Sequence, residues 1–178
     1  MTFRKVGEEQ RYAGPVISVS AGQFVAPDGT EFEREVVHHP GAVAVVPLLD
    51  DGRVVLVRQF RAPVESHVLE IPAGKRDVEG EANEVTAARE LEEEVGLRAG
   101  RLEPLCSFYN SPGISDERCW IFLGRDLQEV PTDLHGPEEE HMTVEHVRLD
   151  DVPALIAAGE LVDSKTVIGL LVARDRVG

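Results

Sequence analysis

Gly74-Lys-Arg-Asp-Val-Glu-Gly-Glu81, continued by Arg89-Glu90-Leu91-Glu92-Glu93-Glu94-Val95-Gly96-Leu97, is the stretch that decides the fold. Seven glutamates and a single arginine lie between Glu79 and Glu94. Like charges one helical turn apart cost a few tenths of a kcal/mol each, so this crowding needs a compensating partner. A divalent cation is the natural partner, because hard cations prefer carboxylate oxygens.

The same stretch predicts a helix from about residue 83 to residue 95, with Gly96 just beyond its last turn. At about 100° per residue, an apolar side that packs on a sheet is expected to hold Ala88, Leu91 and Val95. The opposite side is expected to hold Glu90, Glu93 and Glu94. Arg89 lies one turn before Glu93 and is placed to orient it. A merely solvated acidic face is the alternative reading of such a helix.

The spacing of these residues resembles the Nudix box, in which Gly, five residues, Glu and seven residues precede Arg-Glu-aliphatic-x-Glu-Glu-x-Gly-aliphatic. The agreement is complete from Glu81 onward, whereas six residues separate Gly74 from Glu81. The resemblance implies that Glu90, Glu93, Glu94 and the carbonyl of Ala73 bind Mg²⁺, with Mn²⁺ as a substitute. It also implies that Arg89 orients these ligands and that Glu81 is an accessory carboxylate.

Length and charge limit the classes of protein. A chain of 178 residues is large enough for one ordinary domain with a buried core. The net charge of −15 argues against nonspecific nucleic-acid binding. No apolar run approaches the roughly 20 residues that span a bilayer, and residues 1–10 do not resemble a signal peptide. We expect a cytoplasmic protein that contacts no membrane, with Cys106 and Cys119 as reduced thiols.

Strand patterns dominate the first half of the chain. One hairpin is predicted from residues 16–20 and 23–25, the turn at Asp28-Gly29 and residues 33–38. A second hairpin is predicted from the apolar run 42–49, the turn at Asp51-Gly52 and residues 54–58. Further strands are expected at 68–71, 104–109, 118–123 and 142–149, and a loop is expected at 72–80. Two helices are expected at 152–158 and 164–174, and Asp163 is the candidate N-cap of the second.

These elements predict an α/β (α+β) protein. The resemblance implies a Nudix-type α/β/α sandwich with a mixed central sheet, and an additional N-terminal region of antiparallel strands. We expect residues 1–39 to form that strand region and residues 40–178 to form the hydrolase domain. In the similar enzymes the N-terminal region is exchanged between subunits, so the resemblance also implies a homodimer.

Segments that flank the box resemble those of ADP-ribose pyrophosphatases. They are residues 57–61, residues 69–75 and residues 111–118, and the last contains a proline 16 residues after Gly96. The resemblance implies substrate contacts from Arg58, Arg61, Glu70, Pro112, Gly113 and Glu117. Arginines suit phosphate, and Glu70 could accept from an adenine amino group or a ribose hydroxyl. Solvated strand ends and a simple turn at Pro112-Gly113 remain the alternatives.

The acidic run Glu138-Glu139-Glu140 lies where the similar pyrophosphatases carry a general base on a mobile loop. We favour Glu139, then Glu138, as the base that deprotonates the attacking water; a solvated charge run is the alternative. The expected activity is Mg²⁺-dependent hydrolysis of ADP-ribose to AMP and ribose 5-phosphate. Hydrolysis of another nucleotide sugar or of a nucleoside triphosphate is the first alternative, and a non-catalytic sensor of ADP-ribose is the second.

Overall fold

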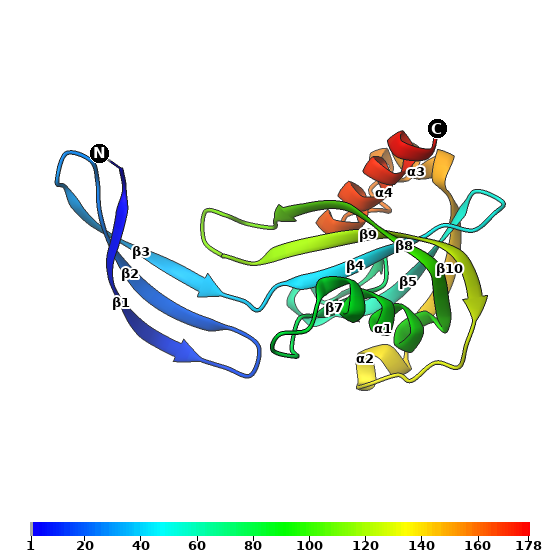
Figure 1. The fold of residues 1–178 in the computed structure, drawn as a ribbon, viewed down its shortest axis with the longest axis horizontal. Coiled ribbons are helices and arrows are strands. Elements are labelled where there is room, and N and C mark those ends of the chain that lie inside the picture. Colours follow the sequence, from blue (N-terminus) through cyan, green and yellow to red (C-terminus); the bar gives the residue numbers. More distant parts are fainter. Residues whose placement is uncertain (1) are drawn as a thin grey trace. The chain divides into compact units, whose positions relative to one another are not determined.

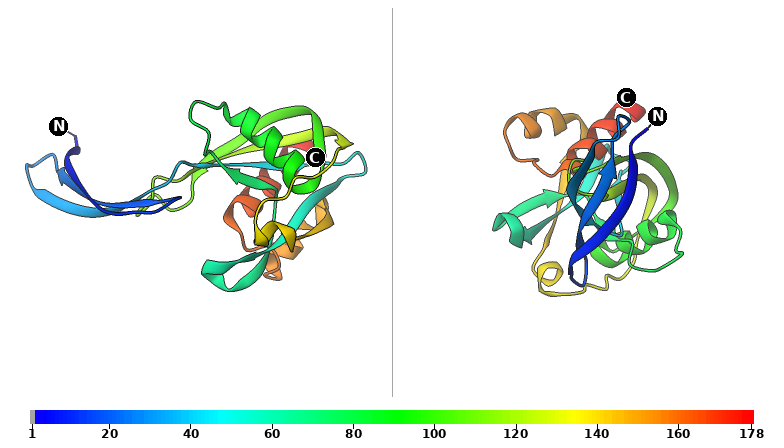
Figure 2. Two further views of the ribbon diagram at one scale, coloured as in Figure 1. Left: turned by 90° about the horizontal axis from the view of Figure 1, so that it is seen from below. Right: turned by 90° about the vertical axis from the view of Figure 1, so that its left-hand side faces the viewer.

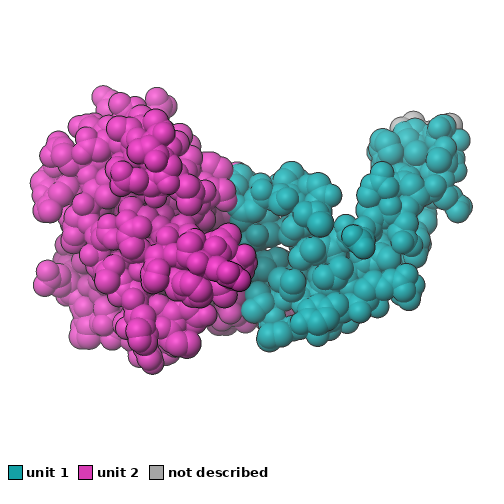
Figure 3. Space-filling model, turned by 180° about the vertical axis from the view of Figure 1, so that it is seen from behind, with its two compact units in different colours: residues 1–41, 108–118 teal, residues 42–107, 119–178 magenta. Residues whose placement is uncertain are grey.

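The computed structural model describes residues 2–178. The chain forms two compact units, which Figure 3 shows in different colours. Residues 1–41 and 108–118 make the first unit, and residues 42–107 and 119–178 make the second. A segment from the middle of the chain therefore joins the N-terminal residues in one unit.

The first unit contains a three-stranded antiparallel sheet in the order β1-β2-β3 (Figure 1). Its strands are β1 (Arg4–Ala13), β2 (Ser18–Val25) and β3 (Glu31–His38). The expected turn at Asp28-Gly29 is present, and Gly29 has the positive φ of 91° that favours glycine there. The sheet is larger than expected, because β1 pairs along its whole length although its sequence has no apolar run.

The second unit is built on two sheets, in the orders β7-β4-β9-β8 and β10-β5-β6 (Figure 1). The four-stranded sheet is mixed, because β4 runs parallel to β9 and antiparallel to β7. Its strands are β4 (Ala42–Pro47), β7 (Ala73–Lys75), β8 (Leu97–Tyr109) and β9 (Arg118–Glu129). The second sheet consists of β5 (Arg53–Arg61), β6 (Ser66–Glu70) and β10 (Thr143–Arg148).

Helices cover both faces of the four-stranded sheet. The helices are α1 (Asn83–Val95), α2 (Pro137–Glu140), α3 (Val152–Ala157) and α4 (Ser164–Val177), with short 3₁₀ turns at Ala62–Val64 and Leu149–Asp151. Ala87 and Leu91 of α1 pack with Val43, Val45 and Phe122. On the other face, Gly169 of α4 lies against Ile71 and Ile121. The sheet lies between α1 and α4 (Figure 2), which is the expected layered α/β/α arrangement.

Two details of the expected strands were wrong. The turn at Asp51-Gly52 forms, but β4 and β5 pair only through the Leu48–Val54 bridge and then enter different sheets. The reason is that β4 is an inner strand whose two edges are already taken by β7 and β9. The expected loop at 72–80 also begins with a short strand, β7, which pairs with β4.

The bounds of α1 agree with the sequence prediction, and Gly96 ends it with a φ of 63°. The assignment of its faces needs correction. Leu91 and Val95 pack on the sheet, but Ala87 and not Ala88 completes that stripe. Glu94 is also buried, because it lies only about 60° around the helix from Leu91.

Candidate active site

The start of β7 and the middle of α1 meet through Ala73 and Glu94. The backbone N–H of Ala73 donates a 3.0 Å hydrogen bond to Oε2 of Glu94. The residue Glu94 is only 5% exposed, which is rare for a carboxylate that lacks a cationic partner. The Ala73 backbone and the Glu94 carboxylate, two of the predicted metal ligands, are therefore in direct contact.

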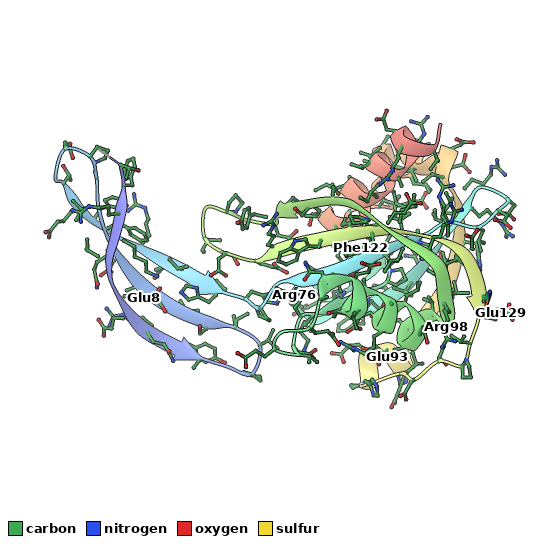
Figure 4. The ribbon with its side chains drawn as sticks, viewed as in Figure 1. Glu8, Arg76, Glu93, Arg98, Phe122 and Glu129 are labelled. Carbon is green, nitrogen blue, oxygen red and sulfur yellow. The ribbon has the colours of Figure 1, made fainter. Side chains whose placement is uncertain are left out.

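Glu90 and Glu93 lie beside them on α1 and share Arg89. Nη1 of Arg89 is 2.9 Å from a carboxylate oxygen of each glutamate. The Glu90 carboxylate also lies directly against Gly74, so closely that a Cβ at residue 74 would overlap it. Glu93 lies on α1 in Figure 4. The expected contact between Arg89 and Glu93 is present, and Arg89 holds Glu90 as well.

Glu81 lies just before α1 and accepts a 2.7 Å hydrogen bond from the hydroxyl of Thr86. The second terminal nitrogen of Arg89 is 3.7 Å from Glu81 and 3.6 Å from Asp77. That nitrogen is buried and makes no hydrogen bond. Arg89 is thus surrounded by four carboxylates, and it is the central cation of the acidic cluster.

The electrostatics of Glu90 and Glu94 favour an added cation. Burial raises the pKa of Glu94 to about 8, and the charges of Glu90 and Glu139 add to this effect. Burial likewise raises the pKa of Glu90 to about 6, against the opposing charge of Arg89. A bound cation would favour the ionised form of both groups.

The donor set is chemically suited to a hard divalent ion, because it consists of carboxylates and a backbone carbonyl. Within residues 2–178, no three acidic, histidine or cysteine side chains are already gathered closely enough to hold a metal ion. The reason is visible in the contacts, since Arg89 holds Glu90 and Glu93 while the Ala73 N–H holds Glu94. Ligation would need these carboxylates to move closer together.

Glu139 belongs to the short helix α2 and accepts a 2.6 Å hydrogen bond from the backbone N–H of His135. Its charge raises the pKa of both Glu90 and Glu94, which places it within electrostatic range of both carboxylates. Glu139 is therefore electrostatically coupled to the cluster on α1.

The two arginines of β5 are both paired with glutamates. Arg58 donates from Nε to Glu145 of β10 at 2.5 Å, and this pair is about one-third exposed. Arg61 donates from Nε and Nη2 to the two oxygens of Glu70, at 2.7 Å each. The charge of Arg61 also lowers the pKa of Glu94, so Arg61 lies near the acidic cluster.

Glu70 is not free to accept hydrogen bonds from a substrate in this arrangement. Its side chain is only 2% exposed, and its oxygens are taken by Arg61 and by the ammonium group of Lys165. Although burial alone would raise the pKa of Glu70, these two cations lower it below its ordinary value. Sequence analysis missed Lys165 and Glu145, because each lies far along the chain from its partner.

The remaining candidates, Pro112, Gly113 and Glu117, belong to the other unit. A cavity of about 370 Å³ lies in that unit. Its lining includes Phe24, Tyr109, Pro112, Gly113 and Ile114. Glu117 does not line this cavity, and its N–H is held at 3.1 Å by the hydroxyl of Ser115.

Comparison with known proteins identifies the class to which this fold and site belong. The NUDIX domain model matches residues 38–167, and the chain belongs to the Nudix family. The ADP-ribose pyrophosphatase of Bacillus subtilis (strain 168) is 40% identical over 163 residues, which are 92% of this chain and 88% of that protein. The methanol dehydrogenase activator of Bacillus methanolicus is 36% identical over 167 residues, which are 94% of this chain and 90% of that protein.

A solved structure described as an ADP compounds hydrolase has the same fold, with a TM-score of 0.84. It is 24% identical, and the match covers 99% of this chain and 95% of the other. Within residues 2–178, no helix has the length and apolar character needed to cross a membrane. Cys106 and Cys119 form no disulfide, as expected, and Cys119 is buried.

Proposed function

We propose that this protein hydrolyses the diphosphate bond of ADP-ribose, giving AMP and ribose 5-phosphate, with Mg²⁺ as its cofactor and Mn²⁺ as a substitute. The observation that carries the proposal is the set of carboxylates on α1 beside the backbone of Ala73, in a chain that belongs to the Nudix family. The relative named ADP-ribose pyrophosphatase supports the choice of substrate, since it aligns along 92% of the chain.

In this proposal Glu90, Glu93, Glu94 and the Ala73 carbonyl hold the divalent ion. When bound, the ion supplies neutralisation of the diphosphate charge and a lowered pKa of water. Arg89 orients Glu90 and Glu93 by its two 2.9 Å contacts. Glu81, which is fixed by Thr86, adds a further carboxylate near Arg89.

Glu139 is proposed as the general base. The effect of its charge on the pKa values of Glu90 and Glu94 supports a proton acceptor near the proposed metal ligands. It would accept the proton of the water that attacks phosphorus, a role typically worth about 10²–10⁴-fold in rate. Glu138 is the second candidate, because it precedes Glu139 on the same short helix.

Arg61 and Arg58 are proposed to bind the phosphates. Both are partly exposed, and a guanidinium that is paired through two nitrogens still has a third available. Glu70 is proposed to act through Arg61 rather than by touching the nucleoside itself. Pro112, Gly113 and Glu117 remain proposed substrate contacts.

The test is hydrolysis of a panel of nucleoside diphosphate derivatives with Mg²⁺, with the products identified by mass. We expect AMP and ribose 5-phosphate from ADP-ribose, at rates well above those of other nucleotide sugars. Glu93→Gln should abolish turnover. Glu92→Gln is the matched control, because Glu92 lies on the same helix but pairs with Arg98 at 2.7 Å. Preference for another nucleotide sugar or for a nucleoside triphosphate would favour the first alternative.

The relative named methanol dehydrogenase activator supports a second candidate function, in which the chain acts as the activator of a dehydrogenase. A rise in the turnover of a purified methanol dehydrogenase when this protein is added would favour the second candidate. Tight binding of ADP-ribose without turnover would instead favour a sensor.

We also propose a homodimer that forms through the N-terminal strand region and works in the cytoplasm. The apolar side chains of β1 support the dimer, because Val6 and Tyr12 are each 54% exposed. Light scattering at micromolar concentration should give twice the monomer mass of 19.5 kDa. Val6→Glu should shift that mass toward the monomer. A wild-type monomer would contradict the proposal.

A further inference from the structure

Glu70 is a buried carboxylate with two cations. Its side chain is 2% exposed, and it ends β6, three residues before β7 begins. One oxygen accepts from Nε of Arg61, and the other accepts from both Nη2 of Arg61 and the ammonium of Lys165. A single buried carboxylate thus holds two cationic side chains that come from β5 and α4.

The two cations differ in their access to solvent. Lys165 is only 13% exposed, whereas Arg61 is 40% exposed. Lys165 is therefore the inner partner of Glu70 and Arg61 is the outer one. A buried carboxylate that loses its last cationic partner is strongly destabilised. If Arg61 were the sole partner of Glu70, the cost of separating them would hold Arg61 in place.

Lys165 is itself fixed at the start of α4. Its ammonium is 3.0 Å from Asp163, and Asp163 caps the helix by accepting from the backbone N–H of Thr166 at 2.9 Å. The Thr166 hydroxyl accepts a 2.9 Å hydrogen bond from the backbone N–H of Ile71. The first turn of α4 is therefore joined to the strand end that carries Glu70.

This arrangement lies next to the acidic cluster. Ile71 is followed by Pro72 and Ala73, and the Ala73 N–H bonds Glu94. Arg61 pairs with both oxygens of Glu70, which lies three residues before Ala73 along the chain. A guanidinium that rotated away from Glu70 would therefore remain beside the proposed site of the diphosphate.

We propose that Lys165 is a positioning residue for substrate phosphate, because it keeps Glu70 paired and thereby allows Arg61 to turn its guanidinium to the diphosphate. The inference rests on the proposed function, since the partner that Arg61 gains is a diphosphate group. Lys165 touches neither substrate nor metal in this scheme. Its effect is on binding, through Arg61 and Glu70.

The test compares Lys165→Met, Lys165→Arg and the double variant Glu70→Gln/Lys165→Met with the wild type. KM and kcat are measured with ADP-ribose, and the dissociation constant is measured by calorimetry with the analogue that has a methylene group between its two phosphorus atoms. Lys165→Met should raise KM and the dissociation constant by about tenfold or more, the usual scale for a hydrogen bond to a charged group. Its kcat should change by less than about threefold.

The other variants separate positioning from general stability. Lys165→Arg should restore binding, because it keeps the inner positive charge. The double variant should also restore it, because no charged Glu70 remains to hold Arg61. Arg176→Met is the matched control. Arg176 lies on α4, as Lys165 does, and its ion pair is with Glu103 of β8, so its loss should leave KM unchanged. If Lys165→Met does not fold, Lys165→Gln takes its place.

Equal loss of binding in Lys165→Met and in the double variant would overturn the inference, as would an unchanged KM in Lys165→Met. Both results would leave the proposed function standing, provided that the wild type hydrolyses ADP-ribose. A wild type that binds the methylene analogue but hydrolyses no ADP-ribose would contradict the proposed function and not the inference about Lys165. The analogue would still show whether Lys165 controls the contact between Arg61 and phosphate.

Discussion

The backbone N–H of Ala73 donates to the buried carboxylate of Glu94 across 3.0 Å, and this hydrogen bond joins the start of β7 to α1. The same two residues are proposed to bind the divalent ion, one through its carbonyl and the other through its carboxylate. The contact therefore fixes the separation of two ligands before any ion arrives. Such preorganisation lowers the cost of binding.

The first prediction concerns Glu94→Gln. Glutamine can still accept from the Ala73 N–H, and it removes a buried carboxyl whose pKa burial raises to about 8. Without metal, the variant should be at least as stable as the wild type. Mg²⁺ should raise the melting temperature of the wild type and not that of the variant. Thermal unfolding with and without Mg²⁺ measures both effects, and an equal Mg²⁺ shift in the two proteins would contradict the assignment.

The second prediction concerns Gly74→Ala. A Cβ at residue 74 would overlap the Glu90 carboxylate, so the side chain of Glu90 must move. We expect Mg²⁺ to bind at least about tenfold more weakly, because metal ligation depends on ligand placement. Calorimetric titration with Mg²⁺ measures this change. Adding Glu90→Asp, which shortens the crowded side chain, should relieve the overlap and recover thermal stability. Unchanged Mg²⁺ affinity in Gly74→Ala would count against Glu90 as a ligand.

The sequence predicts the part of this site that is local along the chain. The bounds of α1 follow from a continuous apolar stripe and from Gly96, and the candidate ligands follow from spacing along that one helix. β1 was missed because nine of its ten residues are exposed and no apolar alternation marks it. β1 forms because its backbone pairs with the antiparallel strand β2, and not because of its own side chains.

Contacts between distant residues could not be predicted in the same way. Lys165 is 95 residues from Glu70, and Glu145 is 87 residues from Arg58. Nothing near Lys165 in sequence marks it as the partner of a buried carboxylate, since the partnership arises only when α4 packs beside β6. Burial of Glu94 was missed for a related reason, because helical projection gives directions around α1 and not the depth of its neighbours.

The third prediction concerns the general base. Glu139→Gln should lower kcat by about 10²–10⁴-fold and leave Mg²⁺ affinity close to that of the wild type. Glu138→Gln and Glu140→Gln are the matched controls, because they change the same charge on the same short helix. Steady-state kinetics with ADP-ribose, together with Mg²⁺ titration, makes the comparison. A collapse of kcat in Glu138→Gln, with Glu139→Gln active, would transfer the role to Glu138.

The last prediction concerns pH and the imidazole of His38 in the N-terminal unit. Its Nδ1 is 2.6 Å from Asp116 and its Nε2 is 2.8 Å from Glu8, so only the protonated ring can donate to both carboxylates. Glu8 lies on β1 in Figure 4, and it is also paired with Lys5. The hydrogen bonds that the ring donates to Asp116 and, with smaller effect, to Glu8 raise the pKa of His38 above its ordinary value of 6.5.

A raised pKa means that the folded protein binds this proton more tightly than the unfolded chain does. The protonated His38 ring therefore stabilises the folded protein fully below pH 6.5. This stabilisation is lost as the pH rises through the pKa that His38 has in the folded protein. His38→Gln should remove this loss of stability with pH. His39→Gln is the matched control and should keep this dependence, because Nδ1 of His39 accepts from the Gly41 N–H and the ring is not held between the two carboxylates that bind His38. Denaturant unfolding between pH 6 and pH 9 tests the pair, and the same pH dependence in wild type and His38→Gln would show that His38 does not couple β1 to the segment at Asp116.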